Sequence, residues 1–260
     1  MRIITCAKEV SSRETRYEIN PEGKWIDESN ISFEINECDE YALEEGLKLK
    51  EKHGGEVTIL TLGRERAEKI MRKGLAMGAD QGLLVLDEDS QINSPFVVAS
   101  ALAKALENEE FDLILTGTQS DDLGYAQTGV MLAELLGLPH ATIVMQIEVD
   151  QESRTVKVLR EMESGWSQWL EMPLPALLTV QAGISAIRYP SLKGIMQAKR
   201  KEIKKVELAS LDLDLSALPA LELRNLYAPR QDRKAELLQG DTASVVDQLL
   251  EKLKKEAKVL

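Results

Sequence analysis

Short apolar runs alternate with amphipathic stretches along the first 138 residues of the chain. A strand buried on both faces of a parallel sheet is apolar throughout, whereas apolar residues spaced three to four positions apart predict a helix. The pattern predicts strands at 2–7, 57–62, 83–86 and 113–116. It predicts helices at 39–52, 64–77, 95–106 and 126–136. This alternation indicates an α/β fold with a doubly wound, mostly parallel sheet.

The rhythm changes after residue 140, where strand-like stretches follow one another without intervening helices. They lie at 141–149, 155–160, 166–171 and 176–181. We interpret the first three as an added β-hairpin layer, at about 141–172, that precedes a last core strand.

From residue 210 the chain reads as an extended arm that ends in an amphipathic helix at 242–259. We therefore divide the chain into an α/β domain at 1–209 and a C-terminal arm at 210–260. An arm of this length buries too little apolar surface to fold alone. The apolar side of its helix packs either on another chain or on its own domain.

Composition narrows the class of protein. The 260 residues carry a formal net charge of -12, which argues against nucleic-acid binding, because phosphate is bound by cationic surfaces. With two cysteines and two histidines, neither a disulfide framework nor a multi-histidine metal site is expected. No apolar run approaches the roughly 20 residues that span a bilayer, and the N-terminus does not resemble a signal peptide. We expect a cytoplasmic protein without direct membrane insertion.

The segment 113–137 is the strongest candidate for a ligand site, because it combines a strand, a glycine-containing loop and a helix start. Ligands of open α/β sheets bind beyond the carboxyl ends of strands, and helix N-termini attract phosphate. With a helix that begins near Tyr125, Thr128 adds a hydroxyl and Gly129 permits close packing. An ordinary strand-to-helix connection, capped by Asp121 or Asp122, remains the alternative. Neither GxGxxG nor GxxxxGK[ST] is present, which disfavours a standard dinucleotide fold and NTP hydrolysis.

No catalytic residue is predicted. His53 ends a predicted helix and His140 follows a proline, so both are interpreted as structural. Cys6 lies inside a predicted strand, and neighbouring acids disfavour the thiolate of Cys38. The basic run at 193–205 is interpreted as a solvated helix face, and Leu192 just before it as a candidate docking anchor.

Several segments in this order resemble the β subunit of electron-transfer flavoproteins. They are GLAMGAD, DLILTGTQSDDLGYAQTG, LREMESG and PALLTVQAGISAIRYPSLKGIMQAKRKEI, followed by the long arm. The resemblance covers nearly the whole chain, and it implies an electron carrier rather than an enzyme. A larger α subunit would hold most of the FAD contacts, while this chain would bury one AMP. Donor dehydrogenases, and a quinone-linked oxidoreductase or another acceptor, would be the partners.

The resemblance also implies site residues. Backbone N–H groups at 126–128 would receive the AMP phosphate. The AMP region would comprise Ala7, Asn36, Glu37, Cys38, Leu62, Gly117, Gln119, Asp122, Gly124, Tyr125, Ala126, Gln127 and Thr128. A recognition loop at 188–197 would dock donors through Arg188, Tyr189, Pro190, Leu192, Ile195 and Met196. Glu161 would orient the flavin domain of the partner.

Three alternatives remain open. Bifurcating members of the family bind a second FAD in place of AMP and carry a loop resembling DGDTAQVGP. Here LGYAQTGV has Thr128 in place of valine and Val130 in place of proline, which favours AMP. An enzyme with the similar sheet of adenine-nucleotide α-hydrolases would need catalytic residues near this loop. A nucleotide-sensing module of the universal-stress type would leave the hairpin, the recognition loop and the arm unexplained.

Overall fold

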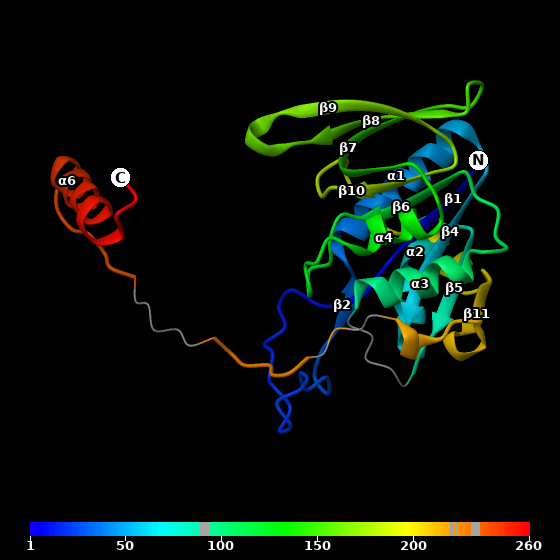
Figure 1. Cartoon of the computed structure of the whole chain (residues 1–260), viewed down its shortest axis with the longest axis horizontal. Helices are drawn as coiled ribbons and strands as arrows, with labels where there is room; N and C mark the ends of the chain where they lie inside the picture. Colours follow the sequence, from blue (N-terminus) through cyan, green and yellow to red (C-terminus); the bar gives the residue numbers. More distant parts are fainter. Residues whose placement is uncertain (89–93, 219–220, 222, 230–234) are drawn as a thin grey trace. The chain divides into compact units, whose positions relative to one another are not determined.

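The computed structural model describes residues 1–88, 94–218, 221, 223–229 and 235–260. The chain forms two units, one of residues 1–18 and 27–223 and the other of residues 19–26 and 224–260. The first unit contains a nine-stranded sheet, drawn in Figure 1, with strand order β11-β5-β4-β1-β6-β10-β7-β8-β9.

The sheet is mostly parallel, as predicted, and seven of its nine strands, the six that follow and β7, each run parallel to a neighbouring strand. Its main parallel strands are β1 (Arg2–Cys6), β4 (Glu56–Gly63), β5 (Gln81–Leu86), β6 (Leu113–Gly117), β10 (Ala176–Val180) and β11 (Ile203–Glu207). The helices of this unit are α1 (Glu37–His53), α2 (Glu68–Met77), α3 (Pro95–Ala105), α4 (Thr128–Leu135) and α5 (Leu192–Ala198). A 3₁₀ turn, η1 (Glu65–Ala67), leads into α2.

Each face of the sheet is covered by its own helices. Ile3 packs in one core with α1 and α2, whereas the next residue, Ile4, packs in a second core with α3 and α4. Successive side chains of a strand point to opposite faces, so an apolar strand such as β1 serves both cores. The doubly wound α/β fold predicted from the apolar runs is therefore confirmed.

The predicted hairpin is present and continues the main sheet. It consists of β7 (His140–Asp150), β8 (Thr155–Glu161) and β9 (Ser167–Pro173). β7 pairs with β10 in parallel, and β8 and β9 follow in antiparallel order, so that β9 forms the edge. Val156, Val158 and Met172 are buried on one face of this extension.

Three helices begin away from their predicted positions, and one of them is α2, which begins at Glu68 after η1 rather than at residue 64. α1 begins at Glu37, two residues before the predicted start, because Asn36 already occupies the N-cap position. α4 begins at Thr128 rather than near Tyr125 or Ala126. Ala126 has a φ of 54°, in the left-handed region, so the helix cannot include it.

The interpretation of residues 193–205 as one solvated helix face was wrong. α5 ends at Ala198, and β11 then pairs in parallel with β5. Ile203 and Val206 are half-buried, while the lysines between them are exposed. Lysines of this kind are typical of an edge strand, where they discourage pairing with another chain. A small antiparallel pair, β2 (Glu9–Ser11) and β3 (Phe33–Ile35), was also not predicted.

The second unit contains the amphipathic helix predicted for the tail. α6 (Thr242–Lys252) is capped by Asp241, whose carboxylate accepts the N–H of Ser244 at 2.9 Å, and a π turn (Leu253–Ala257) follows it. A β-bridge joins Ile19 to Ile26 in the same unit. Within the part of the chain that the structure describes, no helix is long and apolar enough to cross a membrane.

Candidate functional site

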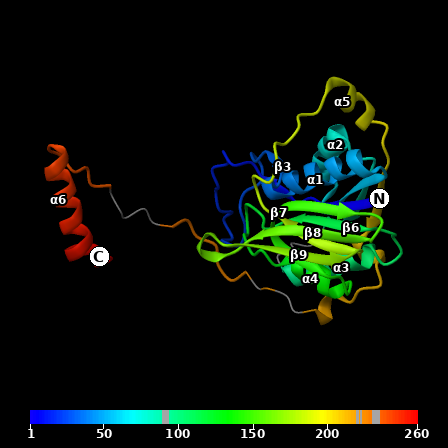
Figure 2. The same cartoon turned by 90° about the horizontal axis from the view of Figure 1, so that it is seen from above.

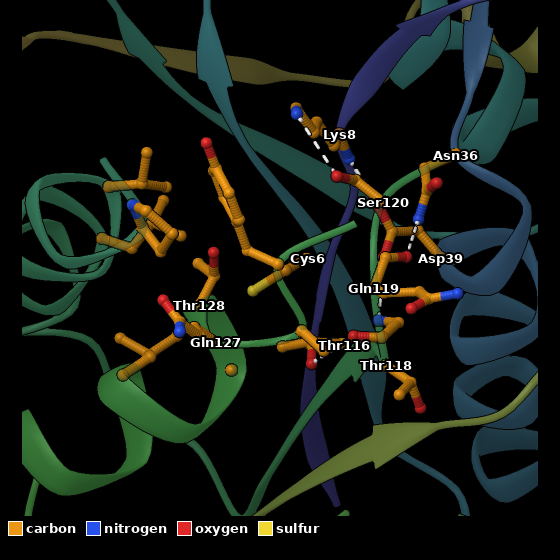
Figure 3. Close-up of a pocket in the computed structure, with 18 of the residues that line it drawn as sticks. Cys6, Lys8, Asn36, Asp39, Thr116, Thr118, Gln119, Ser120, Gln127 and Thr128 are labelled. Atoms are coloured by element: carbon orange, nitrogen blue, oxygen red, sulfur yellow. Dashed lines mark hydrogen bonds between the residues drawn. The ribbon is translucent and has the colours of Figure 1, made fainter. Parts of the chain in front are cut away.

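An open pocket lies where β1, β4 and β6 end, bordered by α3 and α4 (Figure 3). Its wall is apolar along the strands and helices and polar along the loop that follows β6. The apolar side chains are Leu60, Leu62, Pro95, Val98, Leu102, Leu123 and Leu132. In a doubly wound sheet this position is where ligands bind.

The pocket brings together most of the residues that the sequence assigned to AMP. Those that line it are Ala7, Asn36, Leu62, Gly117, Gln119, Tyr125, Ala126, Gln127 and Thr128. Glu37, Cys38, Asp122 and Gly124 are not among its lining residues. Cys38 is buried behind Gly117, and Gly124, with a φ of 61°, forms the turn of the loop. Glu37 forms an ion pair with Arg13.

The start of α4 is packed closely against the sheet. A Cβ added to Gly129 would lie 2.6 Å from Thr116 Oγ1 and 2.8 Å from Thr179 Cγ2. Only glycine therefore lets this helix start approach the strands. The first N–H groups of a helix have no partner inside it, and α4 directs them toward the ligand end of the sheet.

Asp39 joins the ends of two strands to the start of α1. Its carboxylate accepts the N–H of Lys8 after β1 and the N–H of Gly117 at the end of β6, each at 2.8 Å. Asn36 extends this network: its amide donates to the carbonyl of Gln119 at 2.9 Å and accepts the N–H of Asp121 at 2.8 Å. These bonds fix the loop after β6 on the first turn of α1. Asp39 was not recognised as a site residue from the sequence.

Lys8 is the second residue that the sequence analysis missed. It lines the pocket, and its Nζ lies 2.7 Å from both carboxylate oxygens of Asp122 and 3.5 Å from Ser120 Oγ. Although burial alone would raise it, the pKa of Asp122 is held below its usual value by the Lys8 ammonium. The position of Lys8 in the sequence could have identified it, because it directly follows a buried strand of a parallel sheet. Side chains at that position reach the end of the sheet where ligands bind.

Asp39 is expected to make stability depend on pH. Burial raises its pKa from an ordinary value of 3.8 to about 6, so the folded chain holds this proton more tightly than the unfolded chain. The stabilisation is complete below about pH 4 and is lost as the pH rises through about 6. The unfolding free energy of wild type minus that of Asp39→Asn should therefore fall by roughly 2 kcal/mol between pH 4 and pH 6, and by roughly 3 kcal/mol over the whole titration.

Urea denaturation at a series of pH values measures this difference. Asparagine cannot accept both N–H bonds, so the variant loses some unfolding free energy at every pH. This loss does not vary with pH, so it leaves the pH dependence of the difference unchanged. A difference that stays flat from about pH 4 to about pH 7 would contradict the buried, bridging role of Asp39.

Neither cysteine is activated. Burial, followed by the charge of Asp39, raises the pKa of the Cys6 thiol, which lines the pocket as a small uncharged group. Burial likewise raises the pKa of Cys38. Among the described residues, no group of three histidine, cysteine or acidic side chains is arranged to hold a metal ion.

A second surface of the first unit is formed by α5 and the residues before it. Tyr189 is 95% exposed and Leu192 is 83% exposed, and Ile195 and Met196 are exposed beside them. Leu192 is the first residue of α5 rather than part of a loop, and Ser191 caps the helix by accepting the N–H of Gly194 at 3.0 Å. The sequence therefore identified the exposed apolar residues, and it indicated a helix from residue 193, but it placed Leu192 in a loop and extended the helix beyond Ala198.

Arg188 anchors this segment and does not belong to its exposed face. Its guanidinium donates to Glu44 of α1 at 2.8 to 3.1 Å, and it also bonds the carboxylate of Glu51. Glu44 is buried, so these bonds hold the chain before α5 firmly on α1. Pro190 is only partly exposed.

α5 also rests directly on the backbone of α2. A Cβ on Gly194 would lie 2.3 Å from the carbonyl oxygen of Ala76. Arg72 of α2 donates to the carbonyls of Ala198 and Lys201 at 2.8 and 2.7 Å, and Lys201 Nζ donates to the carbonyl of Leu75 at 3.0 Å. The exposed apolar residues of α5 thus stand on a rigid support.

Glu161 lies at the end of β8, where it is exposed to solvent. Its side chain is therefore accessible at the turn end of the β8–β9 hairpin.

A doubly wound sheet with an open pocket beyond its carboxyl ends is typical of nucleotide-binding α/β proteins. Comparison with known proteins identifies the family of the chain. The Electron transfer flavoprotein domain matches residues 24–211. The chain belongs to the electron transfer flavoprotein β-subunit family.

Relatives support this assignment over nearly the full length. The electron transfer flavoprotein subunit beta of Bacillus subtilis is 39% identical over 237 residues, which cover 90% of this chain and 91% of the relative. The subunit beta of Bradyrhizobium diazoefficiens is 37% identical, with both chains fully covered. That of Methylophilus methylotrophus is 33% identical over 98% of this chain and 99% of its own. A β subunit of this family implies an α subunit as partner.

Proposed function

We propose that this chain is the small subunit of a two-chain electron carrier, in which it buries one AMP and helps to shelter an FAD held mainly by the α subunit. The observation that carries the AMP assignment is the pocket at the ends of β1, β4 and β6. Family membership supports the electron-carrier role, and it removes the reason to consider a universal-stress module or an α-hydrolase enzyme.

The residues of the pocket fit a nucleoside monophosphate. The apolar wall formed by Leu60, Leu62 and Leu102 suits the faces of an adenine ring. A phosphate would be held by the first N–H groups of α4, with the hydroxyl of Thr128 beside them. Lys8 supplies one positive charge, which Asp122 partly neutralises, so a single phosphate is better matched than a longer chain.

In the proposed mechanism this chain binds and orients, and FAD, when bound, supplies the redox chemistry. Donor dehydrogenases dock on the exposed side chains of α5, centred on Leu192. Glu161 orients the flavin-bearing domain of the α subunit. Electrons then leave to a quinone-linked oxidoreductase or another acceptor.

Nucleotide content tests this proposal directly. The chain is co-expressed with an α subunit of the same family, the purified complex is denatured, and the released nucleotides are quantified. One FAD and one AMP per complex are expected. Two FAD without AMP would assign the chain to the bifurcating type, and a complex with no adenine nucleotide besides FAD would contradict the role of the pocket.

A further inference from the structure

Tyr125 is the one aromatic residue that the structure describes along the wall of the pocket at the ends of β1, β4 and β6. It is 43% exposed, so the fold leaves much of its ring in water although the residue lines the pocket. Its hydroxyl group has no hydrogen bond within the described residues. Aromatic rings bury a large apolar area and pack well against other flat rings. The ring of Tyr125 is therefore a candidate contact for a flat ligand.

The loop that carries Tyr125 holds it in place through its backbone. The neighbours Gly124 and Ala126 have φ values of 61° and 54°, both in the left-handed region. Glycine adopts this region freely, whereas alanine does so only at an energetic cost. The N–H of Gly124 donates to the carbonyl of Ser120 at 3.0 Å and closes the turn before the ring. A costly conformation of this kind persists where the surrounding structure imposes it, and it is frequent at ligand clamps.

The same loop leaves its last N–H groups without partners. Within the described part of the chain, the N–H groups of Tyr125, Ala126 and Gln127 donate to no other residue. α4 begins with the next residue, and the first N–H groups of a helix are likewise free. Free N–H groups that lie close together attract a phosphate. A phosphate held here would lie next to Tyr125, so the sugar and base of the same nucleotide would come within reach of its ring.

Apolar side chains form the other part of the pocket. α3 and α4 lie side by side on one face of the sheet, as Figure 2 shows. α3 contributes Pro95, Val98 and Leu102 to the pocket. A base that lies on this wall has one face on aliphatic side chains, and its other face needs a second apolar surface. Tyr125, on the loop side, is the described residue that offers a flat one.

We propose that Tyr125 determines which ligands the pocket retains: its ring stacks on the adenine ring of AMP and closes the pocket over the base. This inference rests on the proposed function, since it assumes that AMP is the ligand. It gives the loop after β6 two tasks, because the free N–H groups hold the phosphate and the ring holds the base. A sugar phosphate, which has no base, gains nothing from the ring, so Tyr125 selects nucleotides.

Equilibrium dialysis with labelled AMP, on the purified complex of this chain and the α subunit, measures the contribution of the ring. Tyr125→Ala should raise the Kd of AMP at least about tenfold, because stacking on an aromatic ring contributes that much to the binding of a base. Ribose 5-phosphate is measured by competition with the labelled AMP. It should bind the wild-type and Tyr125→Ala complexes with the same Kd.

Two further substitutions separate the flat ring from its hydroxyl group and from its apolar character. Tyr125→Phe keeps the ring and should retain the wild-type Kd of AMP, since the hydroxyl group has no bond to lose. Tyr125→Leu keeps an apolar side chain without a flat face and should not retain it. Leu135→Ala, at an exposed residue of α4 that does not line the pocket, is the matched control and should leave the Kd unchanged. Without AMP, thermal melts of all variants should coincide.

The outcomes separate the role of the ring from the proposed function. A wild-type complex that contains no AMP would contradict the proposed function, and this inference with it. A wild-type complex that binds AMP with the same Kd as Tyr125→Ala would overturn only the role of the ring. Equal weakening of AMP and ribose 5-phosphate would show that Tyr125 shapes the loop instead. A weaker affinity for the α subunit with unchanged AMP binding would assign the ring to that subunit, and either of these results would overturn the inference.

Discussion

Gly117→Ala is expected to destabilise the fold by about 3 kcal/mol and to abolish nucleotide binding. The new Cβ would lie 2.4 Å from Asp39 Oδ1, 2.7 Å from Cys38 Cβ and 2.9 Å from the Asp39 nitrogen. Two of these atoms belong to the backbone and Cβ of α1, so the helix start itself must move. The move would break the bonds from Asp39 to Lys8 and Gly117 that hold the pocket together. Urea denaturation and the AMP content of the purified complex measure the two effects.

Gly63→Ala provides the matched control for this substitution. Gly63 also ends a strand of the sheet, but among the described residues its added Cβ would meet only the Ala67 Cβ, at an ordinary 3.4 Å. We expect a change in unfolding free energy below about 1 kcal/mol and full AMP content. A Gly117→Ala protein with the same unfolding free energy and AMP content as Gly63→Ala would show that the start of α1 does not hold the walls of the pocket together.

Leu192→Ala is expected to slow electron transfer from a donor dehydrogenase about tenfold or more, through weaker docking. Leu192 is almost fully exposed, so its truncation removes contact area with a partner and little from the fold. The support of α5 on Ala76, Arg72 and Lys201 does not involve this side chain. The rate at which the donor reduces the complex is measured by flavin absorbance at increasing concentrations of the complex. It should give a higher KM, and the FAD content should be unchanged.

Leu135→Ala, on α4, is the control for this experiment, and it should transfer electrons at the wild-type rate. Loss of FAD from the Leu192→Ala complex would show that this residue contributes to cofactor binding instead of docking. An unchanged KM would move the donor surface away from α5.

The fold could be predicted wherever a segment's own pattern determined its structure. The apolar run before Ala7 and the one before Gly117 identify β1 and β6 without further knowledge, because a strand buried on both faces has few polar residues. β11 could not be identified in this way. Its lysines suit a helix face equally well, and only pairing with β5 decides that Ile203 and Val206 belong to a strand.

The same distinction applies to the pocket. The loop from Gly117 to Thr128 could be identified because strand, glycine and helix start follow one another in the sequence. Asp39 and Lys8 were missed because their roles depend on atoms far away in the chain. The carboxylate of Asp39 meets a backbone N–H that is 78 residues distant, and a run of acids around Cys38 gives no indication of it. The left-handed Ala126, which delays the start of α4, likewise has no signal in its residue type.

The way in which α5 is supported has a consequence for the evolution of the protein. The bonds from Arg72 and Lys201 end on main-chain carbonyls, which every residue possesses. The outward-facing positions of α5, such as Leu192 and Met196, can therefore change identity without loosening the helix. Substitutions at these positions would therefore alter the proposed donor surface without moving the helix or the pocket beyond β1, β4 and β6.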